Sequence, residues 1–155
     1  MPAVVEKDTG IVIRPLTAGD RAALLAMYEG FEPKGAADGL PPAHHPEVWL
    51  DRVANNPNLI ALVQDRVVGH GILCPEGTSG ELAVFVHQDY RNRGIGRRLL
   101  TALIQEADRM GLERVWGTTE PDNVAMIRLT GEMGFQPSER ERNIFWTRTH
   151  SSPKP

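Results

Sequence analysis

The clearest periodic pattern of apolar and polar positions lies at residues 95–110. Ile95, Leu99 and Leu103 recur every four residues, further apolar residues lie beside them, and charged residues fill the positions between. Such spacing places the apolar side chains on one face of a helix. Gly111 follows directly and can adopt the left-handed conformation that ends many helices. The pattern therefore predicts an amphipathic helix over 95–110.

Short apolar runs bounded by turn-forming residues predict the strands. Two of these runs flank Asp65 and Arg66, which predicts a β-hairpin with its turn there. Prolines and glycines break every pattern over 31–46, so a loop is expected. Strands are expected over 11–15, 58–64, 67–74, 81–87, 114–118 and 143–148, and further helices after a cap at Thr17 or Asp20, over 47–55 and over 123–133. Hairpins followed by alternating strands and helices predict an α/β, or α+β, fold.

The composition is that of an ordinary globular protein, with 41% hydrophobic and 24% charged residues in a chain of 155. This length predicts one domain over 1–155, with its core at about 10–148 and a polar tail at 149–155. The single cysteine excludes an intrachain disulfide and a cysteine-based metal site. A net charge of −3 without a basic face argues against nucleic acid as a partner. Neither a signal-peptide pattern nor a membrane-length apolar run is present, so a cytoplasmic protein without a membrane partner is expected.

A loop rich in glycine and arginine precedes the helix predicted at 95–110. It runs Arg91-Asn-Arg-Gly-Ile-Gly-Arg-Arg98, and its two glycines allow the backbone to curl tightly. The first N–H groups of the following helix lack partners within it, and the helix dipole makes this end partly positive. With four arginines nearby, these features predict a site for a phosphorylated ligand. Leu99 replaces the third glycine of a dinucleotide-binding fingerprint, and no P-loop Gly-Lys-Ser/Thr follows; an arginine-rich helix start without a ligand is the remaining alternative.

The order Arg-x-x-Gly-x-Gly between a strand and a helix resembles the acetyl-CoA-binding motif of the GNAT acyltransferases, the Gcn5-related N-acetyltransferases. The preceding segment, 82–90, is similar to that family's strand and approach to the loop, with Gln88 where many members carry proline. The segment from Asn123 to Phe135 is similar to the family's later Asn…Gly-Phe segment. The resemblance covers about residues 10–148.

The resemblance implies a GNAT fold, in which a mixed, mostly antiparallel central sheet is flanked by helices. Its two central strands diverge near their middles to hold acetyl-CoA, which would be the co-substrate, and no metal would be required. Strand backbone would hold the pantetheine arm and the acetyl carbonyl, and loop amides would hold the pyrophosphate. The cofactor-binding residues implied in this way are Val84, Phe85, Val86, Arg91, Asn92, Arg93, Gly94, Ile95, Gly96, Arg97 and Asn123.

Acetyl transfer to an amine requires the neutral amine, and only about one lysine in two thousand is neutral at pH 7. Selecting that form costs about 4.6 kcal/mol, which a positioned base can offset. Many family members carry a proton-donating tyrosine seven residues after the asparagine, and some amino-terminal acetyltransferases carry a glutamate five residues before it. Here these positions are Thr130 and Thr118, so the chain departs from both patterns.

The segment that begins at Asn123 is more similar to the acetyltransferase domain of the bacterial Pat-type protein lysine acetyltransferases. In those enzymes the general base is a glutamate ten residues before the residue that opens the loop, and Glu81 stands ten residues before Arg91. A carboxylate inside the strand gap would be partly desolvated, which raises its pKa and improves it as a base. The alternative is that Glu81 simply begins a strand at a solvated turn after Gly80.

The histidines are explained more simply by structure than by catalysis. His44 and His45 lie in the proline-rich loop without partners at metal-ligand spacing. His70 is expected to be a satisfied structural histidine. His87 is expected at the surface, where the central strand ends.

Three further polar residues are weaker candidates for the chemistry. Cys74, at a strand end, is expected to pack rather than act as a nucleophile. Glu120 and Asp122 precede the helix at 123–133 as solvated acids that can attract a cationic amine.

Together these features predict an N-acetyltransferase that moves acetyl from acetyl-CoA directly to a primary amine in a ternary complex. Glu81 is the predicted catalytic residue, and protein lysine is slightly preferred as the acceptor. One alternative is a small-molecule amine acetyltransferase, whose pocket the loop at 31–46 would close. Another is a non-catalytic acyl-CoA-binding regulatory module. A homodimer is compatible with the resemblance.

Overall fold

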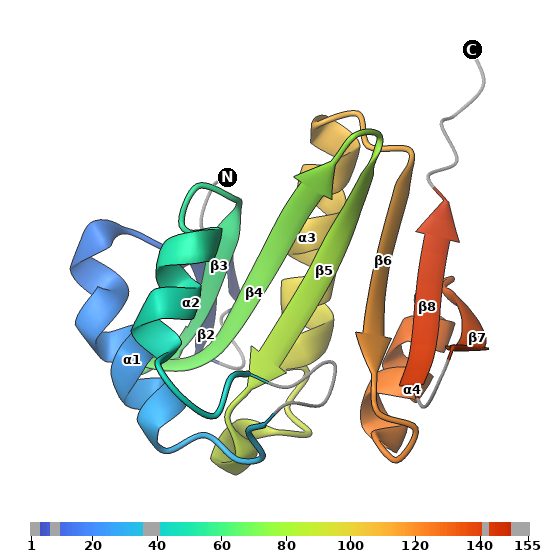
Figure 1. Ribbon diagram of the computed structural model, residues 1–155. Helices are drawn as coiled ribbons and strands as arrows, with labels where there is room; N and C mark the ends of the chain where they lie inside the picture. The colour runs from blue at the N-terminus through green and yellow to red at the C-terminus, as the bar shows by residue number, and fades with distance from the viewer. Residues whose placement is uncertain (1–3, 7–9, 36–40, 141–142, 150–155) are drawn as a thin grey trace.

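A sheet of eight strands, in the order β1-β2-β3-β4-β5-β6-β8-β7, runs through the computed structural model (Figure 1). The structure describes residues 4–6, 10–35, 41–140 and 143–149. Neighbouring strands are antiparallel except β5 and β6, which are parallel. The strands are β1 (Val4–Glu6), β2 (Ile11–Pro15), β3 (Asn58–Val63), β4 (Arg66–Glu76), β5 (Ser79–Val86), β6 (Arg114–Thr119), β7 (Gln136–Arg140) and β8 (Asn143–Thr149). The helices are α1 (Arg21–Glu29), α2 (Pro46–Val53), α3 (Ile95–Arg109) and α4 (Val124–Glu132), with 3-10 turns η1 (Ala18–Asp20) and η2 (Gln88–Tyr90).

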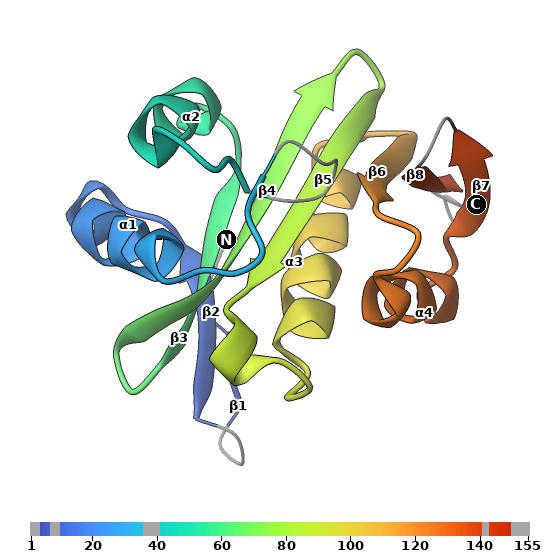
Figure 2. The same cartoon turned by 60° about the horizontal axis from the view of Figure 1, so that its bottom comes forward.

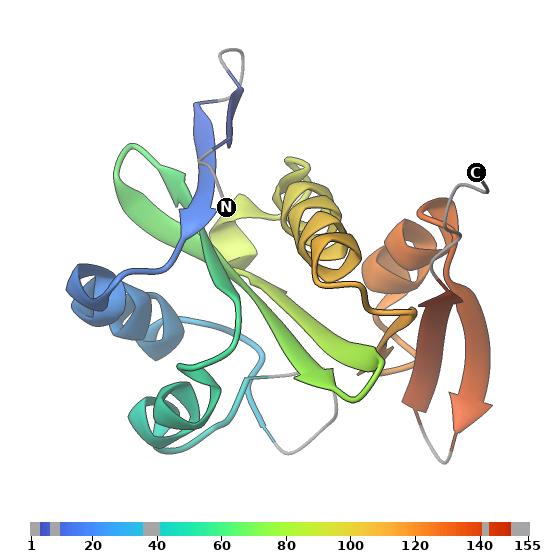
Figure 3. The same cartoon turned by 90° about the horizontal axis from the view of Figure 1, so that it is seen from above.

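Helices cover both faces of this sheet. α1 and α2 lie on one face, and α3 and α4 lie on the other (Figures 2 and 3). Alternate residues of β3 serve the two faces, because Leu59 and Ala61 pack in the core beneath α3 while Ile60 and Leu62 pack beneath α1 and α2. The expected α/β fold, a mixed and mostly antiparallel sheet flanked by helices, is confirmed.

α3 packs closely on β4 because two glycines of that strand leave room for it. A Cβ on Gly69 would come 3.1 Å from Leu99, and a Cβ on Gly71 would come 3.0 Å from Leu103. Both leucines are fully buried, as the four-residue spacing predicted. α3 ends one residue before the expected position, and Gly111 behind it has a φ of 77°, in the left-handed region.

The structure differs from the sequence predictions mainly at turns and sheet edges. β1 and β7 were not predicted; each is short, and the sequence Gln-Pro-Ser-Glu-Arg of β7 has no apolar alternation. The turn between β3 and β4 lies at Gln64 and Asp65, one residue before the predicted turn. Both residues have positive φ, 49° and 64°, as tight hairpin turns that match strand twist require.

Two predicted segments lie partly outside the described residues. Of the tail predicted at 149–155, only Thr149 is described, and it ends β8. Residues 36–40, within the predicted loop at 31–46, are not described. No helix in the described ranges has both the length and the apolar character that crossing a membrane demands.

Candidate active site

The two central strands, β5 and β6, separate partway along β5. Their parallel pairing covers only 79–81 of β5 and 114–116 of β6. Beyond it, β5 remains paired with β4 as far as Val86, and β6 remains paired with β8 as far as Thr119. One edge of each central strand therefore faces the opening that separates them (Figure 1). Backbone N–H and C=O groups along such an edge need partners from elsewhere.

A cavity of about 220 Å³ lies at this opening. β4 and β5 form one side, β6, β8 and the beginning of α4 form the other, and α2 contributes to the rim. The lining residues are Trp49, Val53, Ile72, Cys74, Glu81, Leu82, Ala83, Val84, Phe85, Thr118, Thr119, Asn123, Met126 and Trp146. Glu81 is the sole charged residue among them, so the cavity is apolar apart from one carboxylate and a few neutral polar groups.

The indole of Trp146 forms part of the β8 side of the cavity and lies across Gly117 of β6. The two residues are partners in the sheet, and a Cβ on Gly117 would fall only 2.2 Å from the ring. Trp146 is 1% exposed and meets Phe135 edge to face, with ring centroids 4.9 Å apart. Within the described part of the chain, its buried Nε1 has no hydrogen-bond partner.

Glu81 is the last residue of β5 that pairs with β6, so it stands where the strands separate. Its neighbours across the sheet are Cys74 and Trp116. It lines the cavity but is exposed, so it lies at the mouth and not in the enclosed position that the sequence suggested. Burial raises the pKa of the Cys74 thiol, and the charge of Glu81 raises it further. The carboxylate therefore lines the cavity while it remains open to solvent.

The backbone of the loop before α3 adopts left-handed conformations at two positions. Asn92 has a φ of 65°, and Gly94, the N-cap of α3, has a φ of 81°. Gly96 has no positive φ, and a Cβ there would make ordinary contacts at 3.6 Å or more. Of the two glycines in this loop, only Gly94 has a backbone conformation that favours glycine.

The N-terminus of α3 offers N–H groups to an anion. The first N–H to bond within this turn is that of Arg98, which donates to the carbonyl of Gly94 at 3.1 Å. The amides of 95–97 precede it and belong to the turn whose N–H groups have no helical partner. Aligned peptide dipoles add partial positive charge here, which is the physical basis of phosphate binding at helix N-termini.

Two arginines expected at this phosphate site are engaged elsewhere in the protein. The Nε of Arg91 donates to the carbonyl of Val86 at 2.9 Å, and its Nη2 donates to the carbonyl of Glu32 at 2.8 Å. Arg97 forms an exposed ion pair with Glu132 of α4, which water screens. Backbone amides are therefore better placed than these two side chains to bind an anion.

Thr130 and Thr118 occupy the positions at which some family members carry a catalytic tyrosine or glutamate. Thr130 is buried, and its hydroxyl donates to the carbonyls of Met126 and Ile127 at 3.0 and 3.1 Å, within α4 itself. Thr118 lines the cavity as a neutral side chain. The Oδ1 of Asn123 accepts from the N–H of Met126 at 3.2 Å, so this residue caps α4 while lining the cavity. None of these groups has the acidity of a tyrosine.

His70 is fully buried between Tyr28 and Asn58. The Tyr28 hydroxyl lies 2.6 Å from Nδ1, and the Asn58 Oδ1 lies 2.7 Å from Nε2. The Asn58 Nδ2 already donates to two backbone carbonyls, so its oxygen accepts from Nε2–H while Nδ1 accepts from the tyrosine. Burial lowers the pKa of His70 to about 3, so the ring stays neutral. The predicted structural role is confirmed.

His87, predicted at the surface, is instead buried at 6% exposure. Its Nδ1 accepts from the N–H of Asp89 at 3.2 Å, and its ring meets Phe31 edge to face, because η2 folds over the end of β5. His44 and His45 are exposed. Within the described ranges, no group of three His, Cys, Asp or Glu side chains is placed to hold a metal ion.

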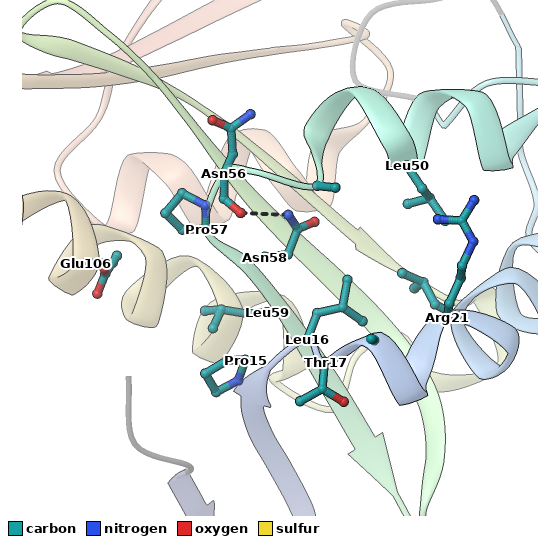
Figure 4. Close-up of a pocket in the computed structure, with 13 residues that line it drawn as sticks. Pro15, Leu16, Thr17, Arg21, Leu50, Asn56, Pro57, Asn58, Leu59 and Glu106 are labelled. Atoms are coloured by element: carbon teal, nitrogen blue, oxygen red, sulfur yellow. Dashed lines mark hydrogen bonds between the residues drawn. The ribbon is translucent and has the colours of Figure 1, made fainter.

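A second, larger cavity of about 580 Å³ lies at η1, α1, α2 and the beginning of β3 (Figure 4). Arg21 pairs with Asp51 at 2.8 Å, and Asn58 bonds to His70 and to the carbonyl of Asn56. Glu106 of α3 also lines this cavity; it lies 3.2 Å from Arg109 in an ion pair, and among the described residues its buried Oε2 has no hydrogen-bond partner. The rest of its lining is mostly apolar. Both cavities include one carboxylate, but the cavity between β5 and β6 also has the open edges of two strands, which can bind an extended ligand through its backbone groups.

Sequence reasoning missed three residues near the gap. Trp49 and Trp146 line the cavity, and Gln88 bonds to the backbone on either side of Phe31, at Gly30 and Glu32. An aromatic residue within a predicted amphipathic helix gave a signal for Trp49. No local signal existed for the other two, whose contacts join segments far apart in the chain.

Residues 22–135 match the model of the acetyltransferase (GNAT) family. The chain is 29% identical over 113 residues to the L-methionine sulfoximine/L-methionine sulfone acetyltransferase of Salmonella typhimurium, a match that covers 59% of this chain and 66%, just under two thirds, of that protein. A ribosomal-protein-alanine N-acetyltransferase from Brucella melitensis has a TM-score of 0.74 and 28% identity, covering 89% of this chain and 99% of that one. The GNAT domain of S. lividans PAT has a TM-score of 0.81 and 18% identity over 96% of both chains, a likeness of fold.

Proposed function

Because the chain belongs to the acetyltransferase (GNAT) family, we propose that it transfers an acetyl group from acetyl-CoA directly to a small primary amine. The observation that carries this proposal is the cavity at the separation of β5 and β6, with Glu81 as its one charged residue. A carboxylate at the mouth of an apolar gap is suited to bind an ammonium group and to remove its proton.

The gap suits a long acyl carrier with a phosphate-bearing end. We assign the carrier's chain to the backbone of Val84, Phe85 and Val86, which lies beyond the last residue pair between β5 and β6. A carbonyl lying in the gap would also give the buried Nε1 of Trp146 an acceptor. The phosphates are assigned to the amides of 92–97, with Asn123 beside the chain. Arg91 would act by holding the loop in shape, because its Nε and Nη2 already donate to the carbonyls of Val86 and Glu32.

The acceptor side of the cavity favours a small amine with an uncharged body. Trp49 and Val53 of α2 face Ile72 and Phe85 of the sheet, and the Trp49 and Phe85 rings meet edge to face at 5.7 Å. Small-molecule sites are typically apolar walls with a few placed polar groups. A polyamine would bring several ammonium groups to a lining with one carboxylate, so a single amine is the better match.

The chemistry assigned to the chain is proton removal and carbonyl polarisation. When bound, acetyl-CoA supplies the acetyl group as an activated thioester. Glu81 accepts a proton from the acceptor's ammonium, and the freed nitrogen lone pair forms the N–C bond with the acetyl carbon. As the C–S bond breaks, the nitrogen loses its second proton to water at the mouth. A β5 amide donates to the carbonyl oxygen as charge develops on it. Water at the open mouth returns a proton to the departing sulfur, because the hydroxyl of Thr130 is buried and bonded within α4.

The expected preference for protein lysine is not supported by the relatives. The Salmonella typhimurium relative is named for methionine derivatives, and the Brucella melitensis structure is named for a ribosomal protein alanine. The PAT domain, at 18% identity, is a likeness of fold alone. A cavity of about 220 Å³ further favours a small acceptor over a protein segment, so small amines replace lysine in the proposal.

The test is thiol release from acetyl-CoA across an amine panel of methionine sulfone, other amino acids, alanine-starting peptides, lysine peptides and polyamines. We expect release with small single amines, and we expect Glu81→Gln to lower kcat by about 10²-fold while changing acetyl-CoA affinity only a few-fold. The matched control is Glu76→Gln, which removes an exposed carboxylate from the same β4–β5 hairpin and should leave kcat unchanged.

Each outcome of the panel bears on a separate part of the proposal. Equal kcat in Glu81→Gln and the native chain would remove Glu81 from the mechanism. Release with lysine peptides alone would overturn the small-amine assignment. Tight acetyl-CoA binding without release by any amine would favour a regulatory acyl-CoA-binding module.

A further inference from the structure

We propose that Gln88 is a positioning residue that ties the segment behind the acceptor side of the cavity, residues 30–32, to the cofactor loop. Its side-chain amide lies against the backbone that follows α1. The Oε1 accepts from the N–H of Glu32 at 2.9 Å, and the Nε2 donates to the carbonyl of Gly30 at 2.6 Å. Two bonds from one planar amide fix both the position and the orientation of this backbone. A proline at this position, as in the family resemblance, could make neither bond.

Arg91 completes the connection from the same side. Its Nη2 donates to the carbonyl of Glu32 at 2.8 Å, and its guanidinium lies over the ring of Phe31 at 5.5 Å. Removal from water lowers the pKa of Arg91, as expected for a guanidinium packed on an aromatic ring. Both backbone polar groups of Glu32 and the carbonyl of Gly30 are therefore bonded to residues between β5 and α3.

The tethered segment packs behind the acceptor wall of the cavity, which is formed by Trp49, Val53, Ile72 and Phe85. Phe31 packs against Tyr28 with ring centroids 5.7 Å apart and against Phe85 at 6.2 Å. Phe85 in turn meets Trp49, which lines the cavity. Displacement of residues 30–32 would thus shift the aromatic packing behind the site at which the amine is proposed to bind.

Gln88 and Arg91 stand immediately before the amides assigned to the phosphates. A ligand that holds 92–97 in one conformation also restrains η2, and through it the backbone at 30–32. Binding at the loop would therefore order the acceptor wall, and the reverse follows by reciprocity. This inference rests on the proposed function, because it needs a coenzyme A moiety at the loop.

The experiment measures amide hydrogen exchange at 29–35 with and without coenzyme A, in the native chain and in Gln88→Leu. Calorimetry with the same probe establishes binding separately. In the native chain we expect coenzyme A to slow exchange of the Glu32 amide by about five- to tenfold, the lower end of common coupling factors. In Gln88→Leu the slowing should disappear while coenzyme A still binds.

Two further variants separate positioning from general stability. Gln105→Leu removes an exposed glutamine from the second half of α3 and should retain the full slowing. Gln88→Glu keeps an acceptor for the Glu32 amide but cannot donate to Gly30, so an intermediate effect is expected. The KM of the amine should rise about five- to tenfold in Gln88→Leu with kcat changed less, a split that simple destabilisation does not produce.

The possible failures are distinguishable. Coenzyme A that binds and slows exchange equally in the native chain and Gln88→Leu would overturn the coupling but not the proposed function. Coenzyme A that binds to the native chain without slowing exchange would likewise overturn the coupling alone. Absence of coenzyme A binding would overturn the proposed function and the coupling with it.

Discussion

Replacing Gly117 by alanine would place a methyl group inside the ring of Trp146. The added Cβ would lie 2.2, 2.3 and 2.8 Å from three carbons of the indole, whereas unstrained carbon contacts lie at about 3.5–4.0 Å. The ring must therefore move by more than about 1 Å. It is 1% exposed and packs against Phe135, so little room exists for this movement.

The expected cost follows from this overlap. Overpacking of a core costs about 1–3 kcal/mol, and occasionally more. Because the clash at Gly117 involves a rigid ring and fixed sheet backbone, we expect about 2–3 kcal/mol, which lowers Tm by about 4–12 °C in a domain of this size. Gly131→Ala is the matched control, since nothing lies within 4 Å of its Cβ position in α4. That substitution should stabilise by about 0.5–1 kcal/mol, so the same added methyl has opposite effects at the two sites.

Urea unfolding followed by far-ultraviolet circular dichroism measures both free energies. Near-ultraviolet dichroism reports whether the tryptophan environment changes in folded Gly117→Ala. A smaller side chain at position 146 should relieve the clash, so Gly117→Ala combined with Trp146→Leu should cost less than the sum of the two single changes. A Gly117→Ala free energy within about 0.5 kcal/mol of the native chain, the range of neutral surface substitutions, would refute this reading of the β6–β8 packing.

Two further predictions concern polar groups outside the gap. Tyr28→Phe leaves the buried Nδ1 of His70 without its donor and should lower the free energy of unfolding by about 1–3 kcal/mol. Tyr90→Phe, a control that also keeps the ring, should change it by less than about 0.5 kcal/mol. Equal losses in the two variants would contradict the hydrogen-bond assignment. The Arg14 guanidinium bonds Asp20 at 2.7 and 2.8 Å and holds the pKa of that carboxyl well below its ordinary value. The ion pair contributes about 1 kcal/mol to the free energy of unfolding. Because the folded-state pKa of Asp20 is lowered, this contribution is present above about pH 4 and is lost as pH falls through the lowered pKa. Asp20→Asn should be less stable than the native chain at pH 7 and should converge with it toward pH 2, and a constant difference across this range would count against the ion pair.

The elements best predicted from the sequence are those whose signals are local. The spacing of apolar residues and the glycine at its end located α3 to within one residue, because both signals belong to the helix itself. β7 carries no such signal, since Gln136–Arg140 becomes a strand by pairing with β8. The β3–β4 turn was displaced by one residue because Gln64, an uncommon residue at positive φ, takes the first turn position.

In the candidate site, too, the residues with local sequence signals were predicted better than those whose contacts join distant segments. The glycine–arginine motif located the loop before α3. The resemblance singled out Glu81 by its spacing from Arg91 and implied an enclosed carboxylate, whereas the structure places it exposed at the mouth of the cavity. The partners of Arg91 were beyond prediction, because its bond to Glu32 joins residues 59 apart in the chain. His87 was misplaced for a similar reason, since its burial depends on η2 and on Phe31 from the segment after α1.

Two departures from the family pattern have connected consequences. Thr130 removes the acid that would assist the departing sulfur, and the proposed base, Glu81, is exposed in the structure. Under the proposed mechanism, bound substrates strengthen Glu81 as a base by displacing water from its carboxylate, while water at the mouth still supplies the proton to the sulfur. Gln88, the other departure, bonds to the backbone of Gly30 and Glu32, which packs behind the acceptor wall. Under the proposed coupling, the wall is fully ordered only when the loop is occupied, so the apparent KM of the amine should fall as acetyl-CoA rises.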